Sequence, residues 1–304
     1  MQRRLCNLAL AAVATVVLCS AAQAVQAYEG ELHQKLTFLA AKQFNRCVAG
    51  TDIPMLTPLQ VRYIAKTNVR QADRNAFVRM FNWRYYDRGS EAERSTLWAV
   101  DTRFHEHFNE VVERLDGSED SAQLYSDLGR VVGYVQLVSS PAHTVPVYTS
   151  RFWRFSFTDR FDTYAVNEAA IQDEIGAAGG FLDQPASDYA SILRSVATDT
   201  LAAVRSPISG LPASWEVFWE PDENPDNFGE YGPAGNNFGR KTEFKCEAEA
   251  RCVLLKNDPL YAQFARERHI TAVRGTIGAM LLMQRGLRVV EEVTEGVTEL
   301  VDVD

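Results

Sequence analysis

Apolar positions along the chain recur with the spacing of an α-helix rather than the alternation of a β-strand. Leu32, Leu36, Leu39, Ala40 and Phe44 keep this spacing in the first such segment. The same rhythm, with start and stop residues at its ends, predicts helices opening at Thr57 and covering 90–115, 124–138, 158–175, 188–204 and 259–286. We therefore expect an all-α fold with a single multi-helix domain.

Two stretches break the helical rhythm. A glycine-rich turn covers 176–187, and a loop rich in Gly, Pro, Asn and Glu covers 221–245. A loop of that length inside a compact domain is often functional or mobile. The tail 291–304 holds six acidic residues and no basic one, so we expect a solvated, frayed end.

The first 27 residues are typical of a secretory signal peptide. Arg3 and Arg4 precede an apolar run over 5–22, and small residues at Ala24 and Ala27 mark two cleavage sites. The alternative is an uncleaved anchor, because the apolar run is marginally long enough to span a bilayer. We expect a secreted or periplasmic protein with a signal at 1–27, a helical domain at 28–289 and an acidic tail at 290–304. No transmembrane segment is expected after cleavage.

The net charge and the cysteine content limit which binding partners and which covalent cross-links we expect. The 304-residue chain carries a net charge of −9, which disfavours binding to duplex nucleic acid. Three cysteines follow the signal. Cys246 and Cys252 are close enough to form a disulfide across a short loop, which leaves Cys47 as a buried thiol.

Three short segments carry a pattern of candidate metal ligands. Segment 28–33 opens on Tyr28 and closes on His33, segment 133–143 closes on His143, and segment 156–163 contains Asp162. Asp73 stands between the first two. In order and spacing, these segments resemble the zinc-dependent phospholipase C and single-strand-specific zinc nuclease superfamily. The resemblance covers most of the chain after the signal.

The resemblance implies a fold and a set of ligands. The fold would be the all-α domain of that superfamily. The amine and carbonyl of Tyr28, freed by cleavage after Ala27, would bind metal together with His33, Asp73, His143 and Asp162. His105, on the helix predicted at 90–115, is a candidate replacement ligand.

Three departures from the family pattern fall in the specific segments. Gly133 and Thr158 stand where the family has histidines, and Leu137 stands where it has the aspartate that holds its metals together. Gly133, Leu137 and Thr158 would then line the cleft that holds the metals in the family, without binding metal themselves. Catalytic zinc needs about three protein ligands and an open position. We therefore expect either no metal or a single zinc.

Two functions remain open. The first is an exported protein that has lost the trinuclear cluster and binds a ligand or partner without catalysis. The second is a divergent metal-dependent phosphoesterase with a rebuilt site. In either case the expected ligand is a phosphoester or a phospholipid. His269, which follows Arg266, Glu267 and Arg268, is expected to be solvated.

Overall fold

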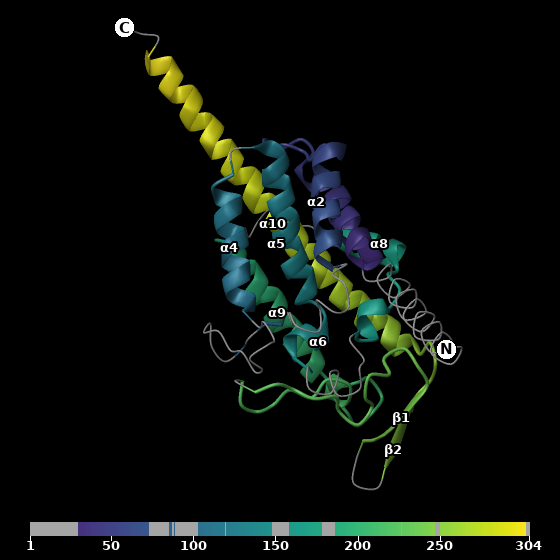
Figure 1. Cartoon of the computed structure of the whole chain (residues 1–304). Coiled ribbons are helices and arrows are strands. Elements are labelled where there is room, and N and C mark those ends of the chain that lie inside the picture. Colours follow the sequence, from purple (N-terminus) through teal and green to yellow (C-terminus); the bar gives the residue numbers. More distant parts are fainter. Residues whose placement is uncertain are drawn as a thin grey trace, which may run out of the picture.

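The computed structural model describes residues 30–72, 85–86, 88, 103–118, 120–147, 158–177, 186–225, 227–246 and 250–301. Within these ranges the chain is mainly helical, as expected (Figure 1). A helix at 30–48 is followed by α2 (Pro58–Ala72), α4 (Phe104–Asp116), α5 (Ser121–Leu137), α6 (Pro141–Thr144), α8 (Glu168–Ala177), α9 (Tyr189–Arg205) and α10 (Pro259–Val301). Two short 3-10 helices, η1 (Phe161–Thr163) and η2 (Trp215–Val217), lie between them.

One small β-hairpin was not expected from the sequence. Strands β1 (Thr242–Lys245) and β2 (Arg251–Leu254) pair antiparallel, with Phe244 opposite Cys252. The predicted disulfide between Cys246 and Cys252 is present and closes the hairpin. Cys47 is half-buried rather than buried.

Helix α5 lies at the centre of the bundle. It packs against α2, α4, α9 and α10, and its residues from Val131 to Gln136 are all buried. Six successive buried residues cover every face of a helix, so this part of α5 lies inside the core. Gly129 lets α5 approach α2 closely, because a Cβ at this position would lie 2.5 Å from the backbone oxygen of Ile64 on α2.

The buried apolar side chains form two clusters. The first surrounds α5, and the second is aromatic and lies around η1, η2 and the start of α10. In the second cluster the rings of Trp215 and Phe264 lie 4.4 Å apart. Phe238 and Phe244, from the loop predicted at 221–245, are buried there. Side chains from that loop therefore form part of the core. Helices α9 and α10 contribute residues to both clusters.

Three predicted helices have different bounds in the structure. The helix expected at 158–175 is replaced by η1 and by α8, which begins at Glu168. The Asp159 side chain is the reason, since it accepts hydrogen bonds from the Phe161 amide, the Trp219 indole and the Tyr231 hydroxyl. Such a bond to a nearby amide competes with helix formation.

The other two differences concern helix ends. Helix α4 begins at Phe104, after a non-helical Arg103, so 90–115 is not one continuous helix. Helix α10 continues to Val301 rather than ending near Gly286, and Figure 1 shows its C-terminal part extending past the other helices. Much of the predicted acidic tail therefore has a helical backbone. Among the described helices, none has a stretch both long and apolar enough to cross a bilayer.

Candidate functional site

The described candidate ligands lie on four different parts of the fold. His33 is on the helix at 30–48, His105 is on α4, His143 is on α6 and Asp162 is on η1. Tyr28 and Asp73 lie outside the described residues. The three cleft positions are Gly133 and Leu137 on α5 and Thr158 before η1.

His33 contacts a buried amide on α5. Its Nδ1 lies 2.8 Å from Oε1 of Gln136, which also accepts a hydrogen bond of 2.8 Å from Nδ2 of Asn68 on α2. The Nε2 of Gln136 donates to the hydroxyls of Thr37 at 3.1 Å and Thr276 at 3.2 Å. We call these five residues the Gln136 network. It joins four helices through side chains that are all at least nine-tenths buried.

The hydrogen bonds assign the proton on His33. An amide oxygen can only accept, so Nδ1 of His33 carries the hydrogen. The two threonines are consistent with this direction, because their hydroxyl groups donate elsewhere and are free to accept from Gln136. The hydroxyl of Thr37 donates a hydrogen bond to the backbone oxygen of His33, and that of Thr276 donates to the backbone oxygen of Ala272. The directions of these hydrogen bonds are therefore mutually consistent, and Oδ1 of Asn68, which faces Gly133, is the buried atom of the network that makes no hydrogen bond within the described residues.

The space beside Gly133 is occupied by amides. A Cβ at Gly133 would lie 3.0 Å from Oδ1 of Asn68 and 3.3 Å from the Gln71 side chain. Leu137, one turn on, packs against the first apolar cluster. Thr158 is half-buried and accepts a hydrogen bond from Asn236 through its backbone oxygen.

His143 and Asp162 lie together at the end of α6. Nε2 of His143 is 3.6 Å from one carboxylate oxygen of Asp162, and the Ser140 hydroxyl donates to the other. A Ser-His-Asp triad requires the serine to bond the histidine. Ser140 bonds the carboxylate, so this arrangement is not a hydrolytic triad.

Tyr86 connects this pair to His105. Its backbone amide donates to the backbone oxygen of His143 at 2.7 Å, and its ring lies 5.0 Å from the ring of His105. His105 is half-buried, and its contact with Tyr86 brings it near His143. Within the described ranges, no group of three or more His, Cys, Asp or Glu side chains is placed to hold a metal ion.

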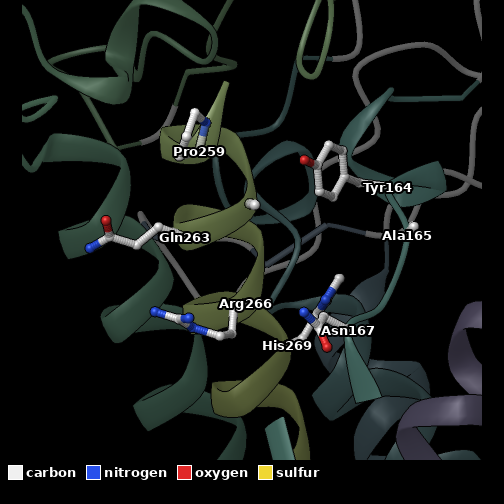
Figure 2. Close-up of a pocket in the computed structure, with 8 residues that line it drawn as sticks. Tyr164, Ala165, Asn167, Pro259, Gln263, Arg266 and His269 are labelled. Atoms are coloured by element: carbon white, nitrogen blue, oxygen red, sulfur yellow. The ribbon is translucent and has the colours of Figure 1, made fainter. Parts of the chain in front are cut away.

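A pocket lies between the first turns of α10 and the segment that follows η1. It has a volume of about 350 Å³ and is lined by Tyr164, Ala165, Asn167, Pro259, Ala262, Gln263, Arg266 and His269. Figure 2 shows that α10 supplies one wall and the Tyr164–Asn167 segment the other. A neighbouring hollow of about 550 Å³ shares Tyr164 and Ala262 and extends to Glu168.

The prediction that His269 is solvated was wrong. Its side chain is 1% exposed and lies 5.8 Å from the ring of Phe161, and burial lowers its pKa to about 4. The imidazole is therefore neutral at pH 7. Its Nε2 is buried without a hydrogen-bond partner among the described residues. The spacing of Ala265, His269, Ala272 and Thr276 along one helix face is the sequence signal that would have placed it inside.

Tyr164, on the facing wall, is also affected by burial, which raises the pKa of its phenol. Both aromatic groups of the pocket therefore stay uncharged at neutral pH. Arg266 carries the one formal charge among the eight lining residues. Comparison of the chain with protein-family models, with curated proteins and with solved structures gave no match.

Proposed function

We propose that this chain is an exported protein that binds a ligand without catalysis, on a helical scaffold of the phospholipase C and zinc nuclease type. The observation that carries the proposal is the filling of the space beside Gly133 by the amides of Asn68 and Gln71. In the family this position supplies a histidine ligand. Zinc in proteins is bound by Cys, His and carboxylate side chains, and amides are not among its usual ligands.

The described residues do not fit a trinuclear zinc cluster. His33 and the His143–Asp162 pair supply donors, but Gly133 has no side chain and Leu137 supports the apolar core. We therefore derive no catalytic step through zinc. The chain has a pocket whose lining includes Arg266 and His269, and ligand binding is the activity that such a pocket supports.

A divergent phosphoesterase is the second candidate, and one observation favours it. Metal-binding histidines usually donate their other ring N–H to an oxygen. His33 donates from Nδ1 to the amide oxygen of Gln136, which is the same arrangement. The proximity of His143 to Asp162 adds two further donors.

Metal content separates the two candidates. The chain would be expressed with its own signal segment, purified without chelator and measured for zinc, for thermal stability with and without EDTA, and for hydrolysis of bis(p-nitrophenyl) phosphate. We expect zinc well below one per chain, a melting temperature that EDTA leaves unchanged and no turnover. Stoichiometric zinc with EDTA-sensitive turnover would overturn the proposal. Loss of that turnover in H143A but not in H107A would then establish the phosphoesterase.

A further inference from the structure

We propose that the pocket between α10 and the Tyr164–Asn167 segment binds a small monocarboxylate with a flat apolar body. The inference rests on the proposed binding function and names the class of ligand. It is carried by two buried nitrogens, one aromatic wall and the distribution of charge around the pocket.

Two side-chain nitrogens of residues that line the pocket lack hydrogen-bond partners within the described part of the chain. Nε of Arg266 and Nε2 of His269 are both buried, and neither makes a hydrogen bond within the described part of the chain. The two residues are three positions apart on α10, so their side chains lie on the same face of the helix. Unpaired buried polar groups are costly and call for a partner. A carboxylate has two acceptor oxygens and is able to serve both nitrogens at once.

Arg266 already has a weak ionic partner, which a ligand would compete with. Its Nε lies 3.4 Å from a carboxylate oxygen of Glu174 on α8, without hydrogen-bond geometry. Both side chains are more than a third exposed. Water screens such a pair strongly, so a ligand carboxylate that approaches in better geometry displaces Glu174 at small cost.

In its neutral form, the imidazole of His269 favours a ligand atom that accepts a hydrogen bond. A neutral imidazole carries one proton, which sits on either ring nitrogen. A ligand oxygen at Nε2 favours the tautomer that donates from Nε2 and so supplies the missing partner. The ring needs no added charge for this contact.

The remaining wall favours an apolar body. The ring of Tyr164 and the small side chains of Ala165, Pro259 and Ala262 line the pocket, and the amides of Asn167 and Gln263 lie among them. A volume of about 350 Å³ is at the lower end of known small-molecule sites. The ligand is therefore of the size of a substituted benzoate rather than of a nucleotide or a lipid.

The charged residues around the pocket favour a ligand with one negative charge over a ligand with two. Arg266 is accompanied by Glu174, and Glu168 lines the neighbouring hollow. The whole chain is acidic, with a net charge of −9. A phosphate dianion would meet these carboxylates with one guanidinium to offset them. A monocarboxylate meets less repulsion and still pairs with Arg266.

Ligand-observed NMR and calorimetry on the purified chain test the proposal. The probes are benzoate and phenylacetate, with benzamide as the neutral analogue and phenyl phosphate as the dianion. We expect a saturable site with a Kd on the order of 1 mM for at least one carboxylate, as suits a ligand of this size. Benzamide and phenyl phosphate should each bind at least tenfold more weakly.

Matched variants locate the site. R266Q should weaken carboxylate binding at least tenfold. R205Q is the control, because Arg205 also lies near a glutamate, with Nε 3.9 Å from Glu216, but does not line the pocket. A262F, a change at an exposed position of α10, should block the pocket and abolish binding even if R266Q folds poorly.

Several results would overturn the inference. These are no saturable binding of either carboxylate, tighter binding of phenyl phosphate or benzamide, or carboxylate binding that survives both R266Q and A262F. Each leaves the proposed non-catalytic function standing, because that proposal is decided by metal content and turnover. Zinc-dependent hydrolysis would remove the proposed function whatever the carboxylates do.

Discussion

Nδ1 of His33 lies 2.8 Å from the side-chain oxygen of Gln136, although the two residues are 103 positions apart in the sequence. The contact fixes the register between the first described helix and α5. Gln136 also makes a direct hydrogen bond with each of Asn68, Thr37 and Thr276. Two of its bonds are accepted by the oxygen and two are donated by the nitrogen.

Replacing Gln136 should therefore destabilise the fold sharply. Q136M keeps the shape of the side chain but removes the acceptor of Nδ1–H of His33 and of one N–H of Asn68, whose other N–H still donates to Thr37. Each buried polar group left unpaired costs about 1–3 kcal/mol. We expect the free energy of unfolding in urea to fall by about 3 kcal/mol. Q34M, at an exposed position of the first helix, should change it by less than about 0.5 kcal/mol. Equal stability of the two variants would show that the network contributes nothing.

Replacing glycine with alanine should change the free energy of unfolding in opposite directions at two helical positions. At Gly129 a Cβ would lie 2.5 Å from a backbone oxygen of α2, which can move only if the helix moves. Overpacking of this kind costs about 1–3 kcal/mol. At Gly286 no atom lies within 4 Å of the added Cβ, so the gain in helix propensity should stabilise α10 by roughly 0.5–1 kcal/mol. Urea titration of G129A and G286A measures both. A stable G129A would mean that α2 and α5 lie farther apart than described.

The buried imidazole should make stability depend on pH. The pKa of His269 is lowered by burial to about 4, whereas an unfolded histidine titrates near 6.5. Between these values the unfolded chain binds a proton that the folded chain excludes. Stability from this residue is therefore complete above pH 6.5 and falls as the pH drops toward 4, by about 3 kcal/mol in all.

The measurement is the unfolding free energy at pH 7.5 and pH 4.5 for the natural chain and for H269Q. The other acidic groups contribute equally to both proteins, so the difference between them isolates His269. We expect H269Q to lose less stability over this interval. A loss identical to that of the natural chain would place His269 in contact with water.

The disulfide predicts a simple thiol count. In denaturant without reductant, a chain lacking residues 1–27 should expose one reactive thiol, that of Cys47. Reduction should raise the count to three. Because the bridged residues are six positions apart, closing this loop restricts the unfolded chain only modestly. Replacing both cysteines with serine should cost at most about 2 kcal/mol. Three thiols before reduction would show that the bridge does not form.

The helices that sequence predicted best are those with a long apolar face and clear ends. The helix predicted at 188–204 agrees with α9, whose N-cap is Asp188. The pairing of Cys246 with Cys252 was equally predictable, because the short spacing between these two residues leaves few alternative disulfide pairings. In both cases the deciding interactions are local in the sequence.

The polar centre of the bundle was not predictable in the same way. Asn68 and Thr276 occupy helix positions that pattern analysis treats as interruptions of an apolar face. Their partners come from helices that only the tertiary fold brings together. The misplacement of His269 has a different origin. The charged neighbours Arg266, Glu267 and Arg268 suggested a solvated stretch, although burial on a helix is set by the face and not by adjacent residues.

The sharing of α9 and α10 between the two apolar clusters has a consequence for unfolding. Ile192 on α9 and Val273 on α10 belong to the first cluster, while Val204 and Phe264 on the same two helices belong to the second. Neither cluster can lose these helices without exposing the other, so the described part of the chain should melt in one cooperative step. Fluorescence of a variant in which Trp83, Trp98 and Trp153 are replaced by Phe would report on Trp215 and Trp219 in the aromatic cluster, and should follow the same transition as the helical circular dichroism of the whole bundle.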